Sequence, residues 1–105
     1  MAGDPARHEL SGIDEAALQA ARHADRLLAA AVELGDARWA AYLEPLPDLL
    51  RDAGPADLRP AALRARAAFG PKDSIRDALP ASATEPFLES VDRLLRVLAR
   101  RELHR

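Results

Sequence analysis

Residues 13–34 read IDEAALQAARHADRLLAAAVEL. Apolar side chains recur in this stretch at steps of three and four residues, which is the spacing that places side chains on one face of an α-helix. The spacing therefore predicts a helix of about six turns with one buried face. The residues on this face are Ile13, Ala17, Ala20, Ala24, Leu27, Ala31 and Leu34.

A second apolar series near the C-terminus has the same spacing and predicts a second long helix, running from Glu85 to Leu103. Its first turn accommodates Pro86, and either Ser82 or Thr84 is expected to cap it. The residues on its buried face are Phe87, Val91, Leu94 or Leu95, and Leu98.

Capping residues mark both ends of the first helix. Ser11 followed by Asp14 resembles a capping box, which is typical of a helix start. Gly35 stands where a left-handed residue commonly ends a helix. Asp36 is a suitable N-cap for a second helix, and so short a turn favours an antiparallel helical hairpin.

Prolines divide the middle of the chain. Pro45 and Pro47 interrupt the second helix, because proline lacks an N–H donor and its ring clashes with the preceding turn. We expect this helix to end near Glu44, and a shorter one to open at Pro47 and run to Ala53. One longer, kinked helix is the alternative interpretation.

A short third helix is expected next, with Asp57 as its cap, Pro60 in its first turn and a stop at Gly70. Its predicted buried residues are Ala61, Leu63, Ala67, Ala68 and Phe69. No stretch alternates in the manner of a β-strand. The predicted fold class is therefore an all-α bundle of four main helices, two long and one or two short, with the second helix broken by prolines. Residues 1–10 are expected to form a frayed tail, and 11–105 a single helical domain.

The composition limits the classes of function. The chain has 105 residues and a net charge of −2, which argues against a nucleic-acid partner because such proteins carry a basic face. It has no cysteine, which excludes disulfides and thiolate chemistry. No apolar stretch has the length of a membrane span or of a signal peptide, so we expect a cytoplasmic protein without a membrane partner.

The core is expected to be thin. The chain has 24 alanines but only one Trp, one Tyr and two Phe, so each buried position contributes little apolar area. Domains with so little buried apolar area often gain stability by pairing with a second copy. We therefore expect a homodimer or a complex with a protein partner. Fourteen Arg against one Lys, together with the abundant Ala, are typical of a GC-rich bacterial genome.

No part of the sequence forms a recognisable catalytic, cofactor-binding or metal-binding motif. His8, His23 and His104 lie far apart, the glycines are isolated, and most of the hydroxyl side chains have capping or helix-surface roles. A catalytic role for His23 would need at least two acidic side chains to converge on it. We therefore expect no enzymatic activity and no cofactor or metal.

Arginines near the C-terminus form a candidate anion patch. Its residues are Arg93, Arg96, Arg100 and Arg101. They could bind a phosphate group or an acidic partner. The alternative is a solvated helix face on which cations interact favourably with the helix dipole.

A candidate partner surface is predicted where the loop over residues 69–77 lies beside the second helix. Its residues are Trp39, Tyr42, Phe69, Lys72, Ser74, Ile75 and Asp77. Ser74 and Asp77 have capping-box spacing, which favours a helical turn. In the alternative interpretation, Phe69 and Ile75 close the end of a thin bundle and the loop only turns the chain.

Two motifs in this region resemble a small bacterial family of unknown function. The family pattern is a Trp-Ala helix with a Leu one turn on, then, after a variable segment, Phe-Gly-Gly-x-Gly-Ser-Leu/Ile-Asn-Asp. The matching residues are Trp39, Ala40, Leu43, Phe69, Gly70, Ser74, Ile75 and Asp77. Pro71 and Asp73 stand where the family has glycines, and Arg76 stands where it has Asn. The resemblance implies a small helical domain and no particular activity.

These observations favour a non-enzymatic protein that acts through protein–protein contacts, as a dimer or as an accessory protein of the immunity or antitoxin kind. The alternative is a domain that binds a small molecule or a phosphate group. Such a ligand would bind at the arginine-rich end of the last helix or in a pocket bounded by Trp39 and Phe69.

Overall fold

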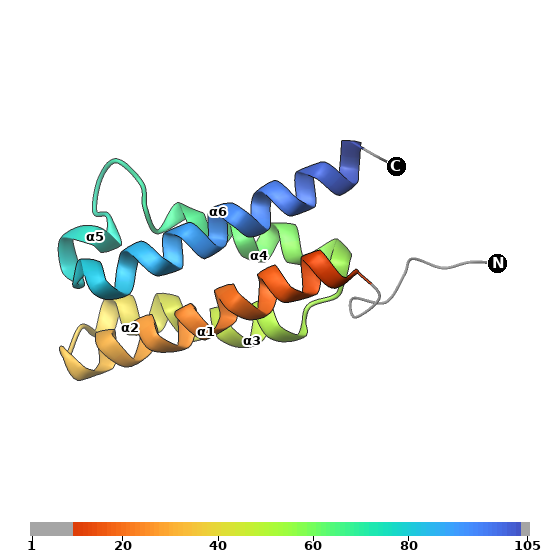
Figure 1. The fold of residues 1–105 in the computed structure, drawn as a ribbon. Coiled ribbons are helices and arrows are strands. Elements are labelled where there is room, and N and C mark those ends of the chain that lie inside the picture. Colours follow the sequence, from red (N-terminus) through yellow and green to blue (C-terminus); the bar gives the residue numbers. More distant parts are fainter. Residues whose placement is uncertain (1–9, 104–105) are drawn as a thin grey trace.

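The computed structural model describes residues 10–103, which form six α-helices and no strand. These are α1 (Ser11–Glu33), α2 (Ala37–Leu43), α3 (Leu46–Asp52), α4 (Pro55–Ala67), α5 (Ile75–Ala78) and α6 (Ala81–Leu103). The long helices α1 and α6 pack side by side and run in opposite directions (Figure 1). α2 and α3 follow one another along α1, and α4 packs against α3 and α6. The arrangement confirms the predicted all-α bundle. None of the helices within residues 10–103 is both long enough and apolar enough to cross a membrane.

The core lies along the contact between the two long helices. The apolar face of α1 is buried from Ile13 to Ala31, as predicted. Leu34 was wrongly predicted to be buried: α1 ends at Glu33, so Leu34 lies in the following turn and is 58% exposed. On α6, Leu94 is the buried member of the Leu94/Leu95 pair.

The turn between α1 and α2 is formed as the sequence predicted. Gly35 has a φ of +71°, a left-handed conformation that glycine adopts without steric cost. Its N–H donates to the carbonyl of Val32, and the N–H of Asp36 donates to that of Ala31, which is the Schellman pattern. The carboxylate of Asp36 then accepts a 3.1 Å hydrogen bond from the N–H of Trp39 and caps α2.

The start of α1 differs from the predicted capping box. The helix begins at Ser11, two residues before the predicted start, and its N-cap is Leu10, whose side chain cannot accept a hydrogen bond. The carbonyl of Leu10 accepts from the N–H of Asp14. Leu10 also packs against the core, although the sequence placed it in the tail. Residues 1–9, the remainder of the predicted tail, and residues 104–105 lie outside the described part of the chain.

The proline-rich segment forms two helices rather than one kinked helix. α2 ends at Leu43, and α3 begins at Leu46 with Pro47 in its first turn, where the missing N–H has no helical acceptor. Leu43 and Leu46 are both fully buried, so the break keeps the same side of the segment in the core.

α4 begins earlier than predicted. Pro55 occupies its first position, and Asp57 lies inside the first turn instead of capping the helix. Pro60 is therefore in the helix interior. The buried residues of α4 are Leu58, Ala61, Ala62 and Ala65. Leu63 and Ala67 were wrongly predicted to be buried, because they fall outside the face that this spacing defines.

α6 also begins before its predicted start. It opens at Ala81, directly after Pro80, so neither Ser82 nor Thr84 is its cap. Thr84 is fully buried and its hydroxyl donates to the carboxylate of Glu85 (3.2 Å). Pro86 lies inside the helix rather than in its first turn.

Candidate binding site

The loop between α4 and α5 is fastened to α6 by two arginine–carboxylate pairs. Arg66 contacts Asp92 at 3.0 Å, and Arg76 forms a bidentate pair with Glu85 at 3.0 and 2.7 Å. Both guanidinium groups lie beside the ring of Phe69, at 5.9 and 5.7 Å from its centroid. The pairs therefore fix the loop at both of its ends.

Phe69 and Ile75 belong to the hydrophobic core and do not form part of an exposed surface. Ile75 is fully buried, and the ring of Phe69 packs against that of Phe87 with centroids 6.2 Å apart. The N–H of Ile75 donates to the carbonyl of Ala68 (2.9 Å) and closes the loop. The placement matches the alternative interpretation of these two residues, in which they close the end of the bundle.

The loop adopts a left-handed backbone at one residue. Asp73 has a φ of +52°, and it stands where the resembled family has its third glycine. Aspartate tolerates this conformation better than most residues with a side chain. The next residue, Ser74, caps α5 by accepting a 3.2 Å hydrogen bond from the N–H of Arg76.

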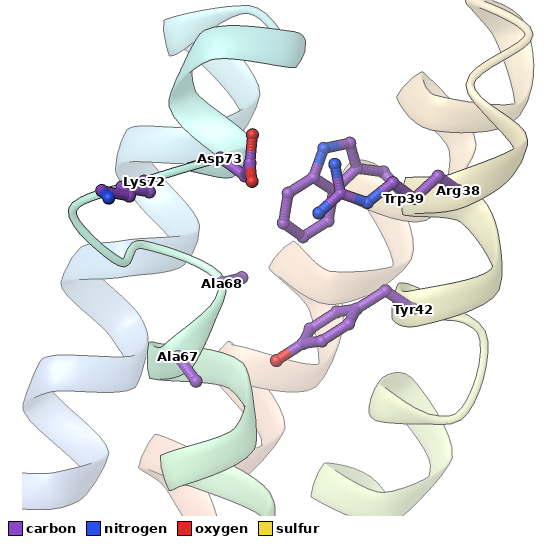
Figure 2. Close-up of a pocket in the computed structure, with 7 residues that line it drawn as sticks. All are labelled: Arg38, Trp39, Tyr42, Ala67, Ala68, Lys72 and Asp73. Atoms are coloured by element: carbon purple, nitrogen blue, oxygen red, sulfur yellow. The ribbon is translucent and has the colours of Figure 1, made fainter.

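A hollow of about 280 Å³ lies between α2 and this loop. We call it the Trp39 hollow (Figure 2); its lining residues are Arg38, Trp39, Tyr42, Ala67, Ala68, Lys72 and Asp73. The predicted neighbourhood of Trp39, Tyr42 and the loop is therefore present. Ala68, rather than Phe69, forms its wall on the α4 side.

Two arginines cover the aromatic rings at this site. The guanidinium of Arg38 lies 5.3 Å from the ring centroid of Trp39, and that of Arg64 lies 5.2 Å from the ring centroid of Tyr42. The two rings meet edge to face, with centroids 5.4 Å apart. Stacking of this kind holds a guanidinium in place while its N–H groups stay available.

Trp39 carries an unused hydrogen-bond donor. The residue is only 7% exposed, and its main-chain N–H is bonded to Asp36. No acceptor within residues 10–103 bonds the indole N–H. Buried indole N–H groups nearly always have a partner. In Figure 2 the indole nitrogen and the carboxylate of Asp73 lie at the same end of the hollow.

The hollow has more positive than negative charge. Arg38 and Lys72 line it and, within the described part of the chain, form no ion pair with a carboxylate. Asp73 provides one carboxylate, which faces the indole across the hollow (Figure 2). The side chain of Lys72 points away from the indole, so Lys72 acts on the hollow only at longer range.

The other predicted site residues lie elsewhere. Asp77 is exposed on α5 and does not line the Trp39 hollow. In the anion patch, Arg93 reaches toward Glu15 of α1 at 3.7 Å, whereas Arg96 and Arg100 are exposed and Arg101 is half-buried. Arg93 thus lies beside a carboxylate of α1.

A second hollow of about 250 Å³ contains His23. Gln19 and His23 of α1 face Glu89 and Arg93 of α6 across it. Burial, together with the nearby charges of Arg26 and Arg22, lowers the pKa of His23. Within residues 10–103, no three His, Asp or Glu side chains gather closely enough to hold a metal ion.

Sequence reasoning missed four residues that line the Trp39 hollow: Arg38, Ala67, Ala68 and Asp73. Arg38 precedes Trp39 in the sequence and offered only that adjacency as a signal. Asp73 offered no signal beyond its place in the loop over residues 69–77, and its left-handed backbone depends on how that loop folds.

Comparisons of the chain with protein-family models, with curated proteins and with solved structures gave no match.

Proposed function

We propose that the protein acts by binding a protein partner at the Trp39 hollow and does not catalyse a reaction. The observation that carries this proposal is the indole N–H of Trp39. The residue is only 7% exposed, its indole N–H has no acceptor within residues 10–103, and it lines an accessible hollow. A bound partner that supplies an acceptor would complete this site.

The residue types at the hollow support a protein contact. Trp, Tyr and Arg are enriched at interfaces and dominate their energetics, because each combines a large apolar surface with a polar group. Trp39, Tyr42 and Arg38 provide all three within one helix. The net charge of −2 favours a protein over a nucleic acid as the partner.

The experiment uses Trp39 as its own reporter, since it is the only tryptophan of the chain. The partner is sought by capture with the wild type and with Arg38→Gln, and the captured protein is then identified, purified and titrated. We expect binding to change the emission of Trp39 and to weaken in Arg38→Gln. The matched control is Arg96→Gln on α6, which should bind like the wild type.

A second copy of the chain is also a candidate partner. If copies pair at the hollow, the emission of Trp39 should change with protein concentration in step with the mass measured by sedimentation. The proposal is wrong if no protein, including a second copy, binds in a way that depends on Arg38.

A further inference from the structure

The donors at the Trp39 hollow match an anionic acceptor. Trp39, itself only 7% exposed, offers an indole N–H that has no acceptor within residues 10–103, and the guanidinium of Arg38 lies over the same ring. The hydroxyl of Tyr42 is not available, because it donates to the carbonyl of Arg64. A carboxylate accepts several hydrogen bonds at once, and those from charged donors are the strongest.

Building on the proposed function, we propose that the group inserted into the Trp39 hollow is the side-chain carboxylate of an Asp or Glu in the partner. The indole N–H of Trp39 and the guanidinium of Arg38 would both donate to it. The ammonium of Lys72 would attract it at longer range, since a charge that does not touch its partner still acts through the low-dielectric rim.

Asp73 weakens the attraction of the hollow for anions. Its carboxylate faces the indole, so it repels any anion that enters (Figure 2). The two cationic side chains together carry more charge than this one carboxylate, so the net interaction with an inserted carboxylate is attractive. Asp73 can also accept a main-chain N–H from the segment that carries the inserted carboxylate.

The test uses pools of short peptides with acetylated and amidated ends, mixed at every position except the central one. The central residue is Glu, Gln, Lys or phosphoserine, and a fifth pool has central Gln with a free C-terminal carboxylate. The readout is the indole ¹⁵N–¹H resonance of Trp39, which is a single peak because the chain has one tryptophan. We expect the Glu pool to shift this peak at the lowest concentration.

Three variants test how individual charged side chains change the affinity for the Glu pool. Arg38→Gln should weaken binding of the Glu pool about tenfold, the usual cost of losing a hydrogen bond to a charged group. Asp73→Asn should strengthen it, because the like charge is removed while the left-handed backbone is retained. Arg96→Gln should leave it unchanged. All three side chains are exposed, so the fold should be kept.

The outcomes separate this inference from the proposed function. If the Gln or Lys pool shifts the peak as well as the Glu pool, or if Asp73→Asn weakens binding, the carboxylate assignment is wrong although a peptide-binding hollow remains. If the phosphoserine pool or the pool with the free C-terminal carboxylate binds more tightly than the Glu pool, the inserted group is that phosphate or that terminal carboxylate and not an acidic side chain. If no pool moves the peak in the wild type or in Asp73→Asn, and no partner protein does so, both proposals fail.

Discussion

The hydroxyl of Tyr42 on α2 donates a 2.5 Å hydrogen bond to the main-chain carbonyl of Arg64 on α4. α4 tightens at its end, where the N–H of Ala68 bonds to the carbonyl of Ala65 instead of that of Arg64. The carbonyl of Arg64 is thus one of the unpaired groups that every helix end leaves. Tyr42 satisfies it and joins the two helices that flank the Trp39 hollow.

Removing the hydroxyl of Tyr42 tests how much its hydrogen bond to α4 stabilises the fold. Tyr42→Phe should lower the free energy of unfolding by about 1 kcal/mol, the usual net value of one hydrogen bond. Urea unfolding followed by the emission of Trp39 measures the change. An unchanged free energy of unfolding would mean that water replaces the hydroxyl at no cost.

The backbone of Asp73 makes a second prediction. Asp73→Val should lower the free energy of unfolding by about 1–2 kcal/mol, because β-branched residues are disfavoured at positive φ. Asp73→Asn should be close to neutral, since Asn also tolerates this conformation. Thermal unfolding of the pair gives the comparison, and equal melting temperatures for the Val and Asn variants would contradict the left-handed backbone.

The end of the α1 apolar face can be tested with two leucines. Leu27 is fully buried and Leu34 is 58% exposed. Leu27→Ala should therefore cost about 2–5 kcal/mol of stability through lost burial and a cavity. Leu34→Ala should stay within about 0.5 kcal/mol of the wild type. Similar costs at both sites in urea unfolding would show that Leu34 is covered in solution.

The pair formed by Arg76 and Glu85 predicts a pH dependence. The hydrogen bonds from Arg76 lower the pKa of Glu85 from its ordinary value of 4.5. A carboxyl with a lowered folded-state pKa stabilises the fold above the unfolded value and loses this contribution as the pH falls. The melting-temperature difference between the wild type and Glu85→Gln should therefore shrink below pH 4.5. A difference that does not change with pH would indicate that the two side chains are separated in solution.

His23 predicts a pH effect in a higher range. Burial lowers its pKa from 6.5, so the unfolded chain takes up a proton at a pH where the folded protein does not. Its contribution to stability is present above pH 6.5 and declines as the pH falls through the folded-state pKa. An NMR titration of the imidazole should have a midpoint below 6.5, and His23→Gln should remove this part of the pH dependence. A midpoint at or above 6.5 would contradict the burial of this side chain.

The long helices and the first turn were predictable because their signals are local. The spacing of Ile13 through Ala31 repeats over many turns, and Gly35 with Asp36 has one obvious structural use. The starts of α4 and α6 were missed because Pro55 and Pro80 are weak signals until tertiary packing selects the helix register. Leu34 was misassigned because periodicity continues past the point where the helix ends.

The Trp39 hollow was predictable only as a neighbourhood. The sequence predicted that the loop over residues 69–77 lies near Trp39 and Tyr42, because the expected helical hairpin and short third helix leave few other positions for this loop. It could not show that the indole N–H lacks an acceptor, because that depends on every side chain around it. Nor could it show which of Arg38, Arg64 and Lys72 faces the hollow.

The pairing of α1 with α6 also constrains how the chain is made. Part of the apolar face of α1 is covered by α6, which is translated last among the described elements. During synthesis, α2 and α3 become available to pack on α1 first, and the part that α6 covers stays exposed until α6 has emerged. Contacts so distant in sequence form late. A stop codon before Phe87 would remove most of α6, and its product should therefore be degraded by proteases faster than the 105-residue chain.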